Sequence, residues 1–303
     1  MDDRLPGWAP EPFSDTPMAL EGSEASVAAG DAVRPCRANV ARVYDCLLGG
    51  KDHFEADRVV AERIGQGAPW IPAGARANRA FLVRAVECLV RAGVDQFLDI
   101  GTGLPTARNV HEVARDISPN VRVVYVDHDP VVVCHARALL ARQDGVCAVE
   151  ADARDPAGVL EQACGVGGLD LSRPVGLLFV AVLHFVAEAE DPDGILRAFA
   201  RVLPSGSFLV LSHGLSITGR GASRRRQALL AYQQDTAPVT LRSRRRITEL
   251  FDGWDLVPPG LVEIDQWRPV TRRPTRTRVP VLAGVARLAP PPTQGKDVVM
   301  RGG

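Results

Sequence analysis

The fold class is decided by the stretch Phe97-Leu-Asp-Ile-Gly-Thr-Gly-Leu-Pro-Thr106. In this stretch a short apolar run ends in a carboxylate, Asp99, and breaks into a turn that contains Gly101 and Gly103. A segment compatible with a helix follows, and a second apolar run then ends in Asp127. A strand, a tight turn, a helix and a second strand that ends in an acidic residue make up a nucleotide-binding βαβ unit.

The residues of this unit indicate its cofactor. Glycines in the turn let a ligand approach the backbone closely, because no Cβ occupies the space. Asp127 can accept hydrogen bonds from both ribose hydroxyls of an adenosine, and Asp99 suits a ligand that carries an ammonium group. S-adenosylmethionine (SAM) combines an adenosine, a sulfonium and an amino-acid tail. We therefore predict SAM as the cofactor and S-adenosylhomocysteine (SAH) as the product.

Other nucleotide ligands fit the sequence less well. The dinucleotide fingerprint requires a third glycine where this chain has Thr106, preceded by Pro105, which disfavours NAD and FAD. The stretch Gly49-Gly50-Lys51-Asp52 lacks the upstream glycine and the hydroxyl of a phosphate-binding loop. An NAD-linked oxidoreductase is thus the less favoured alternative.

Composition predicts a soluble, cytoplasmic protein with one sizeable domain. The chain has 303 residues, 46% of them hydrophobic, and can bury a substantial core. Its formal net charge is +0, so no global field attracts nucleic acid or an anionic membrane. The start of the chain lacks the apolar run of a signal peptide, and no segment approaches the ~18 uninterrupted apolar residues of a membrane span.

Cysteine and histidine give no indication of a metal. The six cysteines form no Cys-x-x-Cys pair and no zinc-like cluster with histidine, which favours scattered thiols in a reducing compartment. His111, His128 and His135 show no convergent spacing. We expect no metal site.

Apolar periodicity divides the chain into four regions. We expect a disordered tail over 1–36, an N-terminal helical lid segment over 37–95, a SAM-binding core over 96–288 and a flexible tail over 289–303. Three helices are predicted in the lid segment: Asn39–Leu48, Phe54–Ile64 and Asn78–Arg91.

The core region alternates strands with helices. This alternation implies an α/β fold with a mostly parallel sheet and helices on both faces. Two late apolar runs, Leu256–Ile264 and Val279–Arg287, suit an antiparallel hairpin at the sheet edge and would complete a seven-stranded sheet. The predicted parallel strands are Gln96–Ile100, Val121–Val126, Val146–Glu150, Val175–Val180 and Ser207–Ser212.

Several segments resemble one known family. They are Ala38–Phe54, Ala77–Leu82, Phe97–Thr106, Asn109–Val113, Val180–Val186, Leu211–His213 and Ala237–Ser243. Together they are similar to the SAM-dependent methyltransferases of actinobacteria that were first catalogued as a domain of unknown function, and the likeness extends over residues 37–288. The resemblance implies the class I, Rossmann-like methyltransferase fold and SAM binding, but no particular acceptor. Two residues depart from the family pattern: Cys46, where tyrosine is usual, and His53, where asparagine is usual.

In such a fold ligands bind beyond the carboxyl ends of the strands, which suggests roles for the residues there. We expect Thr102 and the two glycines beside it to line the methionine portion of SAM, Asp99 to contact its ammonium, and Asp127 to hold the ribose. The alternative for these aspartates is helix capping or turn chemistry. Four more residues are expected at the adenine: His128, Asp129, Asp152 and Ala153.

A lid and a general base complete the predicted site. Tyr44, Lys51, Asp52 and His53 are expected to fold over the cofactor, with Tyr44 in contact with it; the alternative is a helix end with solvated charges. His184, after the fourth strand, is the first candidate for the base, and His53 is a second. His184 could instead only bond the backbone, and His213 in the substrate pocket has the same ambiguity.

We therefore predict an enzyme that transfers a methyl group from SAM to an unidentified acceptor, with a small metabolite favoured. One alternative is a non-catalytic SAM-binding sensor. Another is a nucleic-acid methyltransferase, suggested by the arginine runs 224–226, 244–246 and 272–278. Exposed helix faces explain such runs more simply, since aromatic residues are not interleaved with them.

Overall fold

The computed structural model describes residues 37–141, 143–216, 222–269 and 279–289, all within one compact unit that spans Pro35–Gly303. The predicted tail over 1–36, residues 290–303 of the predicted tail over 289–303, and the arginine run 272–278 lie outside the described residues. None of the described helices is both long enough and apolar enough to cross a membrane.

An eight-stranded sheet forms the centre of the described unit. Its order is β3-β2-β1-β4-β5-β8-β6, and β7 also pairs with β8. The first five strands are parallel to one another, and β8 is antiparallel to its three neighbours. The strands are β1 Gln96–Ile100, β2 Arg122–Asp127, β3 Val146–Glu150, β4 Gly176–Val180, β5 Phe208–Gly214, β6 Trp254–Leu256, β7 Val262–Glu263 and β8 Val281–Leu288. All five predicted parallel strands are confirmed to within two residues.

The predicted closing hairpin is wrong in detail. The run Leu256–Ile264 is not one strand but two short ones, β6 and β7, that pair with different parts of β8. Pro258 and Pro259 separate them, and proline has no N–H to donate to a ladder. The sheet therefore has eight strands rather than seven.

Helices cover both faces of the sheet, as predicted. On one face α4 (Trp70–Arg91), α5 (Val110–Arg115) and α6 (Pro130–Leu139) pack through Phe81, Val113, Ala136 and their neighbours. On the other face α7 (Pro156–Gly165), α8 (Pro192–Val202) and α10 (Arg244–Glu249) pack through Leu160, Phe199, Ile247 and others. Three short 3-10 turns lie at Leu183–Phe185 (η1), Glu188–Glu190 (η2) and Ile264–Gln266 (η3).

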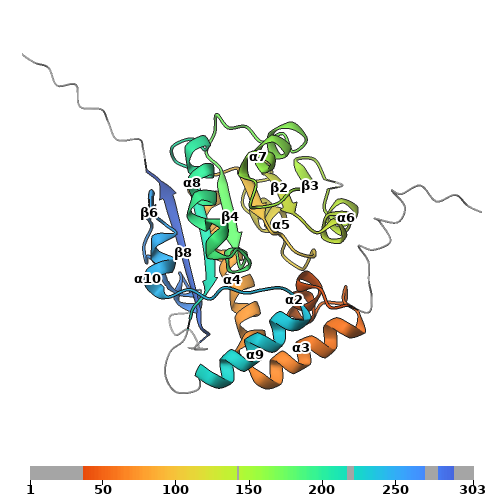
Figure 1. Cartoon of the computed structure of the whole chain (residues 1–303). Helices are drawn as coiled ribbons and strands as arrows, with labels where there is room; N and C mark the ends of the chain where they lie inside the picture. Colours follow the sequence, from red (N-terminus) through yellow and green to blue (C-terminus); the bar gives the residue numbers. More distant parts are fainter. Residues whose placement is uncertain (1–36, 142, 217–221, 270–278, 290–303) are drawn as a thin grey trace, which may run out of the picture. The chain divides into compact units, whose positions relative to one another are not determined.

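Three helices and the start of α4 form a separate layer, which we call the helical cap. Its members are α2 (Val40–Leu48), α3 (Glu55–Gly67) and α9 (Ala222–Asp235). Figure 1 shows α9 in cyan lying along α3 in orange, with α2 in red close by. The cap has its own apolar cluster, consisting of Val43, Val60, Ala61, Ile64, Ile71 and Tyr232.

Two features of the cap differ from the sequence expectation. Helix α4 begins at Trp70, eight residues before the predicted start at Asn78. The early Pro72 is tolerated, since the first turn of a helix has no intrahelical partner for its N–H groups. Helix α9, more than 150 residues away in sequence, joins the cap through Tyr232 and through an ion pair between Arg63 and Asp235.

Candidate functional site

The glycine turn after β1 has the predicted backbone geometry. Gly101 and Gly103 have φ values of 65° and 66°, in the left-handed region that favours glycine. A Cβ at Gly101 would lie 2.6 Å from Val182, whereas a Cβ at Gly103 would meet no atom within 4 Å. The first glycine is thus required by packing, and the second leaves open space at the carboxyl end of the sheet.

Two buried carboxylates flank this turn. Asp127 is 7% exposed, and its two oxygens accept hydrogen bonds from the N–H groups of Gly103 and Asp129, both at 3.0 Å. Asp99 is 6% exposed and accepts a hydrogen bond from the Thr102 hydroxyl at 3.2 Å. Among the described residues neither carboxylate forms an ion pair with an arginine or lysine.

Burial dominates the electrostatics of this pair. Desolvation raises the pKa of Asp99 to about 7, although the positive charge of Arg79 and the Thr102 hydroxyl oppose the shift. Burial also raises the pKa of Asp127, against the effect of its two N–H donors. Two carboxylates without a paired cation are costly to keep ionised, so this edge favours a cationic, hydroxyl-bearing ligand.

The residues predicted at the adenine have different surroundings. Asp152 accepts two hydrogen bonds from Arg154 Nε, at 2.9 and 3.0 Å, and Arg154 also contacts Glu190 at 2.8 Å. These side-chain hydrogen bonds lower the pKa of Asp152. The His128 ring is 72% exposed, and its Nδ1 lies 3.5 Å from Asp127. Ala153 is half-buried against the core of the α7 face.

Asp129 connects the sheet edge to the cap. One of its oxygens accepts from Val131 N at 2.8 Å and begins α6, while the other accepts from Asn39 Nδ2 at 2.6 Å. The Oδ1 of Asn39 in turn accepts from Ala41 N and Arg42 N and caps α2. The first residue of the cap is therefore bonded to the turn beyond β2.

The middle of α2 is bonded to the tips of β4 and β5. Asn78 Nδ2 donates to the Tyr44 hydroxyl at 2.9 Å, and this hydroxyl donates to Ala75 O at 3.2 Å. Ser212 Oγ donates to Asn78 Oδ1 at 2.6 Å and accepts from Ala181 N at 2.9 Å. Tyr44 is thus held in a buried chain of hydrogen bonds that reaches the sheet.

The predicted lid loop is organised by a residue that the sequence reasoning missed, Asp45. Its carboxylate is 2% exposed and accepts from Asp52 N at 3.0 Å. The same oxygen lies 2.9 Å from Nδ1 of His53, whose side chain is 12% exposed. Lys51 is exposed. Of the predicted lid residues, Tyr44 and His53 are therefore fixed by side-chain bonds and Asp52 by its backbone.

His184 and His213 lie together beneath the site, with ring centroids 5.7 Å apart. His213 is fully buried; its Nδ1 lies 2.8 Å from Gly214 O, and its Nε2 lies 2.7 Å from Arg242 Nη1. Both ring nitrogens are occupied, so His213 has none left for a substrate. His184 Nδ1 is buried with no hydrogen-bond partner among the described residues.

Both imidazoles are neutral at neutral pH. Burial, with His213 and Arg242 adding to it, lowers the pKa of His184 to about 3, and burial lowers the pKa of His213 to about 4. Arg242, which is 3% exposed, also donates to Leu183 O at 2.7 Å and to Val186 O at 2.8 Å. This arginine fixes the loop after β4 that carries His184.

The residues that the sequence reasoning missed lie inside the segments that carry the family resemblance. Asn39 and Asp45 belong to Ala38–Phe54, and Ser212 belongs to Leu211–His213. Asn78, Arg79 and Arg242 lie in two other such segments, Ala77–Leu82 and Ala237–Ser243. Their place in these segments was the one sequence signal that could have pointed to them, but only the tertiary contacts reveal what each side chain does.

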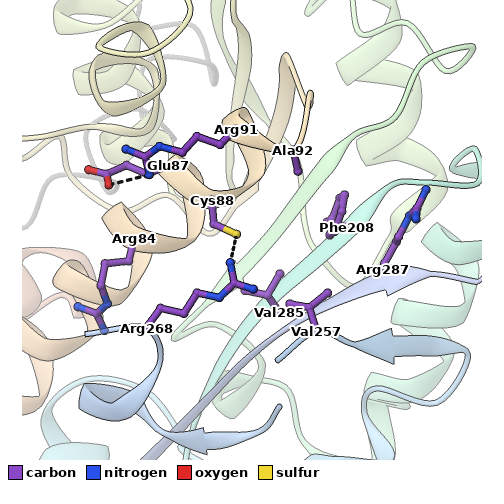
Figure 2. Close-up of a pocket in the computed structure, with 10 residues that line it drawn as sticks. All are labelled: Arg84, Glu87, Cys88, Arg91, Ala92, Phe208, Val257, Arg268, Val285 and Arg287. Atoms are coloured by element: carbon purple, nitrogen blue, oxygen red, sulfur yellow. Dashed lines mark hydrogen bonds and ion pairs between the residues drawn. The ribbon is translucent and has the colours of Figure 1, made fainter. Parts of the chain in front are cut away.

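A separate cavity of about 560 Å³ lies at the opposite, amino end of the parallel strands. Figure 2 shows Arg268 reaching toward Cys88, with Phe208, Val257 and Val285 on the sheet beside them. No predicted site residue lines it, and it is not where the carboxylates converge. Its lining is Arg84, Glu87, Cys88, Arg91, Ala92, Phe208, Val257, Arg268, Val285 and Arg287.

The arginines of the run 244–246 all make intramolecular contacts. Arg246 Nη1 donates to Asp193 at 2.9 Å, and its Nη2 donates to Glu188 at 2.9 Å. Arg245 pairs with Glu249, and Arg244 donates to Leu261 O, both at 3.0 Å. In the part of the chain that the structure describes, no three His, Cys, Asp or Glu residues converge as metal ligands.

The strand order and the site together define a class of protein. A glycine turn after β1, an acidic residue at the tip of β2 and an antiparallel strand inserted beside β5 characterise the class I SAM-dependent methyltransferases. The chain belongs to the S-adenosyl methyltransferase family, whose model matches residues 27–289. It is accordingly a SAM-dependent methyltransferase, and the family resemblance of the sequence is confirmed.

Two solved structures are similar over nearly their whole length. A DUF574 family protein from Streptomyces avermitilis is 38% identical, with a TM-score of 0.77, and the match covers 84% of this chain and 98% of that one. A candidate methyltransferase from Thermobifida fusca is 34% identical, with a TM-score of 0.79, and the match covers 86% of this chain and 98% of that one. No curated protein matches the sequence.

The residues at the carboxyl edge fit the cofactor of this family. SAM carries an ammonium and two ribose hydroxyls, and this edge offers two buried carboxylates that form no ion pair with an arginine or lysine of the described residues. The open space beside Gly103 leaves room for a ligand against the turn. The donor and acceptor chemistry of SAM therefore matches what the chain leaves unpaired.

Proposed function

We propose that the protein methylates a small molecule that binds beneath the helical cap, next to the carboxyl ends of β4 and β5. The observation that carries this proposal is the attachment of α2 at both ends of the site. Asn39 bonds to Asp129 beyond β2, and Tyr44 connects through Asn78 to Ser212 of β5. A site covered in this way encloses a small acceptor more readily than a nucleic-acid strand.

Within this proposal the ribose, the ammonium and the adenine of the cofactor each have a partner. Asp127 accepts from the ribose hydroxyls, Asp99 accepts from the ammonium, and the backbone at residues 101–103 lines the methionine portion. His128, Ala153 and Asp152 border the adenine, where Asp152 shares its carboxylate with Arg154. Asp129 and Tyr44 support this arrangement through their bonds to Asn39 and Asn78.

The reaction requires alignment first and proton removal second. When bound, SAM supplies a methyl carbon activated by the sulfonium, and the leaving thioether is neutral. The chain must therefore orient the acceptor and, where the acceptor atom holds a proton, remove it.

Of the two candidate bases we favour His53. Asp45 lies 2.9 Å from its Nδ1, which favours the tautomer with the proton on Nδ1 and leaves Nε2 as an acceptor. The pKa of about 3 for buried His184 makes that imidazole a weak base. We assign to His184 the role of a neutral hydrogen-bonding group facing the acceptor.

The test is SAH production from SAM with a size-fractionated metabolite extract. We expect the small-molecule fraction to support turnover, and His53→Ala to slow it by about 10²- to 10⁴-fold while SAH binding stays unchanged. His135→Ala, on α6 outside the site, is the matched control. Turnover with RNA or DNA alone would contradict the proposal, and binding without turnover in every fraction would favour a sensor.

A further inference from the structure

Arg79 is positioned against the loop that follows the glycine turn. From α4, its Nη2 donates to Arg108 O at 2.9 Å, to Ala107 O at 3.3 Å and to Asn109 Oδ1 at 3.5 Å. The same Asn109 oxygen accepts from Thr106 N at 3.1 Å. Arg79 and Thr106 are therefore neighbours, brought together around one amide oxygen.

Each of these residues has a buried donor without a partner. Among the described residues, neither Arg79 Nε nor Thr106 Oγ1 makes a hydrogen bond, and both atoms are shielded from solvent. Arg79 likewise forms no ion pair with a described carboxylate. Buried polar groups in folded proteins normally have partners, and unpaired ones call for an explanation such as a ligand.

Arg79 also lies close enough to Asp99 for its charge to act on that carboxylate. Burial raises the pKa of Asp99, and the charge of Arg79 is the strongest of the effects that oppose this shift. No hydrogen bond joins the two side chains, since Asp99 bonds to Thr102 and Arg79 to the loop. An anion and a cation thus face the same turn without neutralising each other by contact.

We propose that Arg79 and Thr106 bind the α-carboxylate of the SAM methionine portion, opposite Asp99, which binds the ammonium. The methionine portion of SAM carries an ammonium and a carboxylate on the same carbon. Its recognition therefore requires one anionic and one cationic partner close to each other. This inference rests on the proposed placement of SAM at the carboxyl edge.

Two ligands that differ only in the carboxylate test this subsite: SAM and decarboxylated SAM, each titrated by calorimetry into the full chain. We expect the wild type to bind SAM about 10- to 100-fold more tightly than the decarboxylated compound, as befits a charge-assisted bond. Arg79→Gln should lower the affinity for SAM by a similar factor and leave that for the decarboxylated compound within about twofold. Arg79→Lys, which keeps the charge, should restore part of the preference.

Two further variants separate recognition from folding. Thr106→Val removes one donor while keeping the shape, and we expect about a three- to tenfold loss for SAM alone. Arg76→Gln, an exposed neighbour on α4, should change neither affinity. Equal losses for both ligands in Arg79→Gln would overturn the subsite, because they would mean that Arg79 only shapes the turn. A wild type that binds neither ligand would overturn the cofactor placement as well.

Discussion

Two regions of this methyltransferase each bury a pair of aspartates, and among the described residues only the pair in the helical cap includes an ion pair with a buried arginine. In the helical cap, Asp57 is fully buried and accepts from Arg42 Nε at 2.7 Å, Asn39 N at 2.9 Å and Phe54 N at 2.8 Å. Asp45 of the cap bonds to the loop that follows α2. At the sheet edge, Asp99 and Asp127 are almost as deeply buried but have no arginine or lysine partner among the described residues.

The difference separates architecture from function. A buried carboxylate that pairs with a buried arginine, as Asp57 does with Arg42, fixes one conformation, because removing it leaves the guanidinium buried without its partner. A buried carboxylate that lacks a cation is held at a free-energy cost, and a ligand that supplies the missing charge recovers that cost. We therefore expect the cap aspartates to control folding and the edge aspartates to control binding.

The largest effect is expected from Asp57→Ala in the cap. This change leaves the Arg42 guanidinium buried without its ion-pair partner and removes the acceptor for two N–H groups. The free energy of unfolding should fall by about 3–5 kcal/mol, measured by urea denaturation. The control is Arg58→Ala, which breaks an exposed pair with Glu55 on the same helix and should leave the denaturation midpoint unchanged. Similar denaturation midpoints for the two variants would contradict the structural role assigned to Asp57.

Next in size is the effect of Asp127→Ala at the edge. The variant loses the charge-assisted bonds to the ribose, so SAH affinity should fall by about 100-fold or more while the chain stays folded. Asp152→Ala should cost only a few-fold, because Arg154 already occupies that carboxylate. Calorimetry measures both values. Unchanged affinity in Asp127→Ala would remove this residue from the site.

A smaller effect, of opposite sign, is expected from Asp99→Asn. The folded-state pKa of Asp99 is raised to about 7, so its ionisation destabilises the fold; this cost is absent below the unfolded pKa near 4 and complete above pH 7. The ligand-free Asn variant should therefore be more stable than the wild type by about 2 kcal/mol at pH 8 and equal to it near pH 4. Urea denaturation at the two pH values decides the matter. A loss of stability at pH 8 would show that the carboxylate is structural, as in the cap.

The smallest expected effect is the pH dependence of SAH binding at the sheet edge. SAH binding needs ionised Asp99, so its affinity should fall about tenfold between pH 8 and pH 6 in the wild type. His184 and His213, with pKa values of about 3 and 4, stay neutral over this range. Asp99→Asn should bind SAH weakly but with a flat pH profile. An equal slope in that variant would assign the titration to another group.

Local pattern predicted the parallel strands well, because they are short, mostly apolar runs. It failed where two prolines divided the run Leu256–Ile264 into strands that pair with separate parts of β8. It also missed the start of α4, since Pro72 and Gly74 conceal a helix whose stability comes from packing against α2 and the sheet. Secondary-structure propensity depends on one segment alone, whereas strand pairing and helix packing also depend on the segments that lie beside it.

The candidate site divides in the same way. Asp99 and Asp127 could be predicted because they lie at the ends of their strands, and Gly101 and Gly103 because they belong to the turn that follows; the ends of parallel strands share one edge. Asn39, Asn78, Ser212 and Arg242 could not, since each acts on a residue far away in sequence. His213 was placed in the substrate pocket by its position after β5, but Arg242 and Gly214 occupy both of its nitrogens.

By itself the sequence determined the order of strands and helices, the glycine turn, the two edge carboxylates and thus the cofactor. These features can be read from local sequence, because each depends only on an apolar run and on the residues at its end. Only the tertiary structure decided which buried charges are paired, how the cap is bonded to the sheet and which histidine keeps a free nitrogen. Those properties depend on burial and on partners from distant segments, and the free energy of a charge is set by what surrounds it in space.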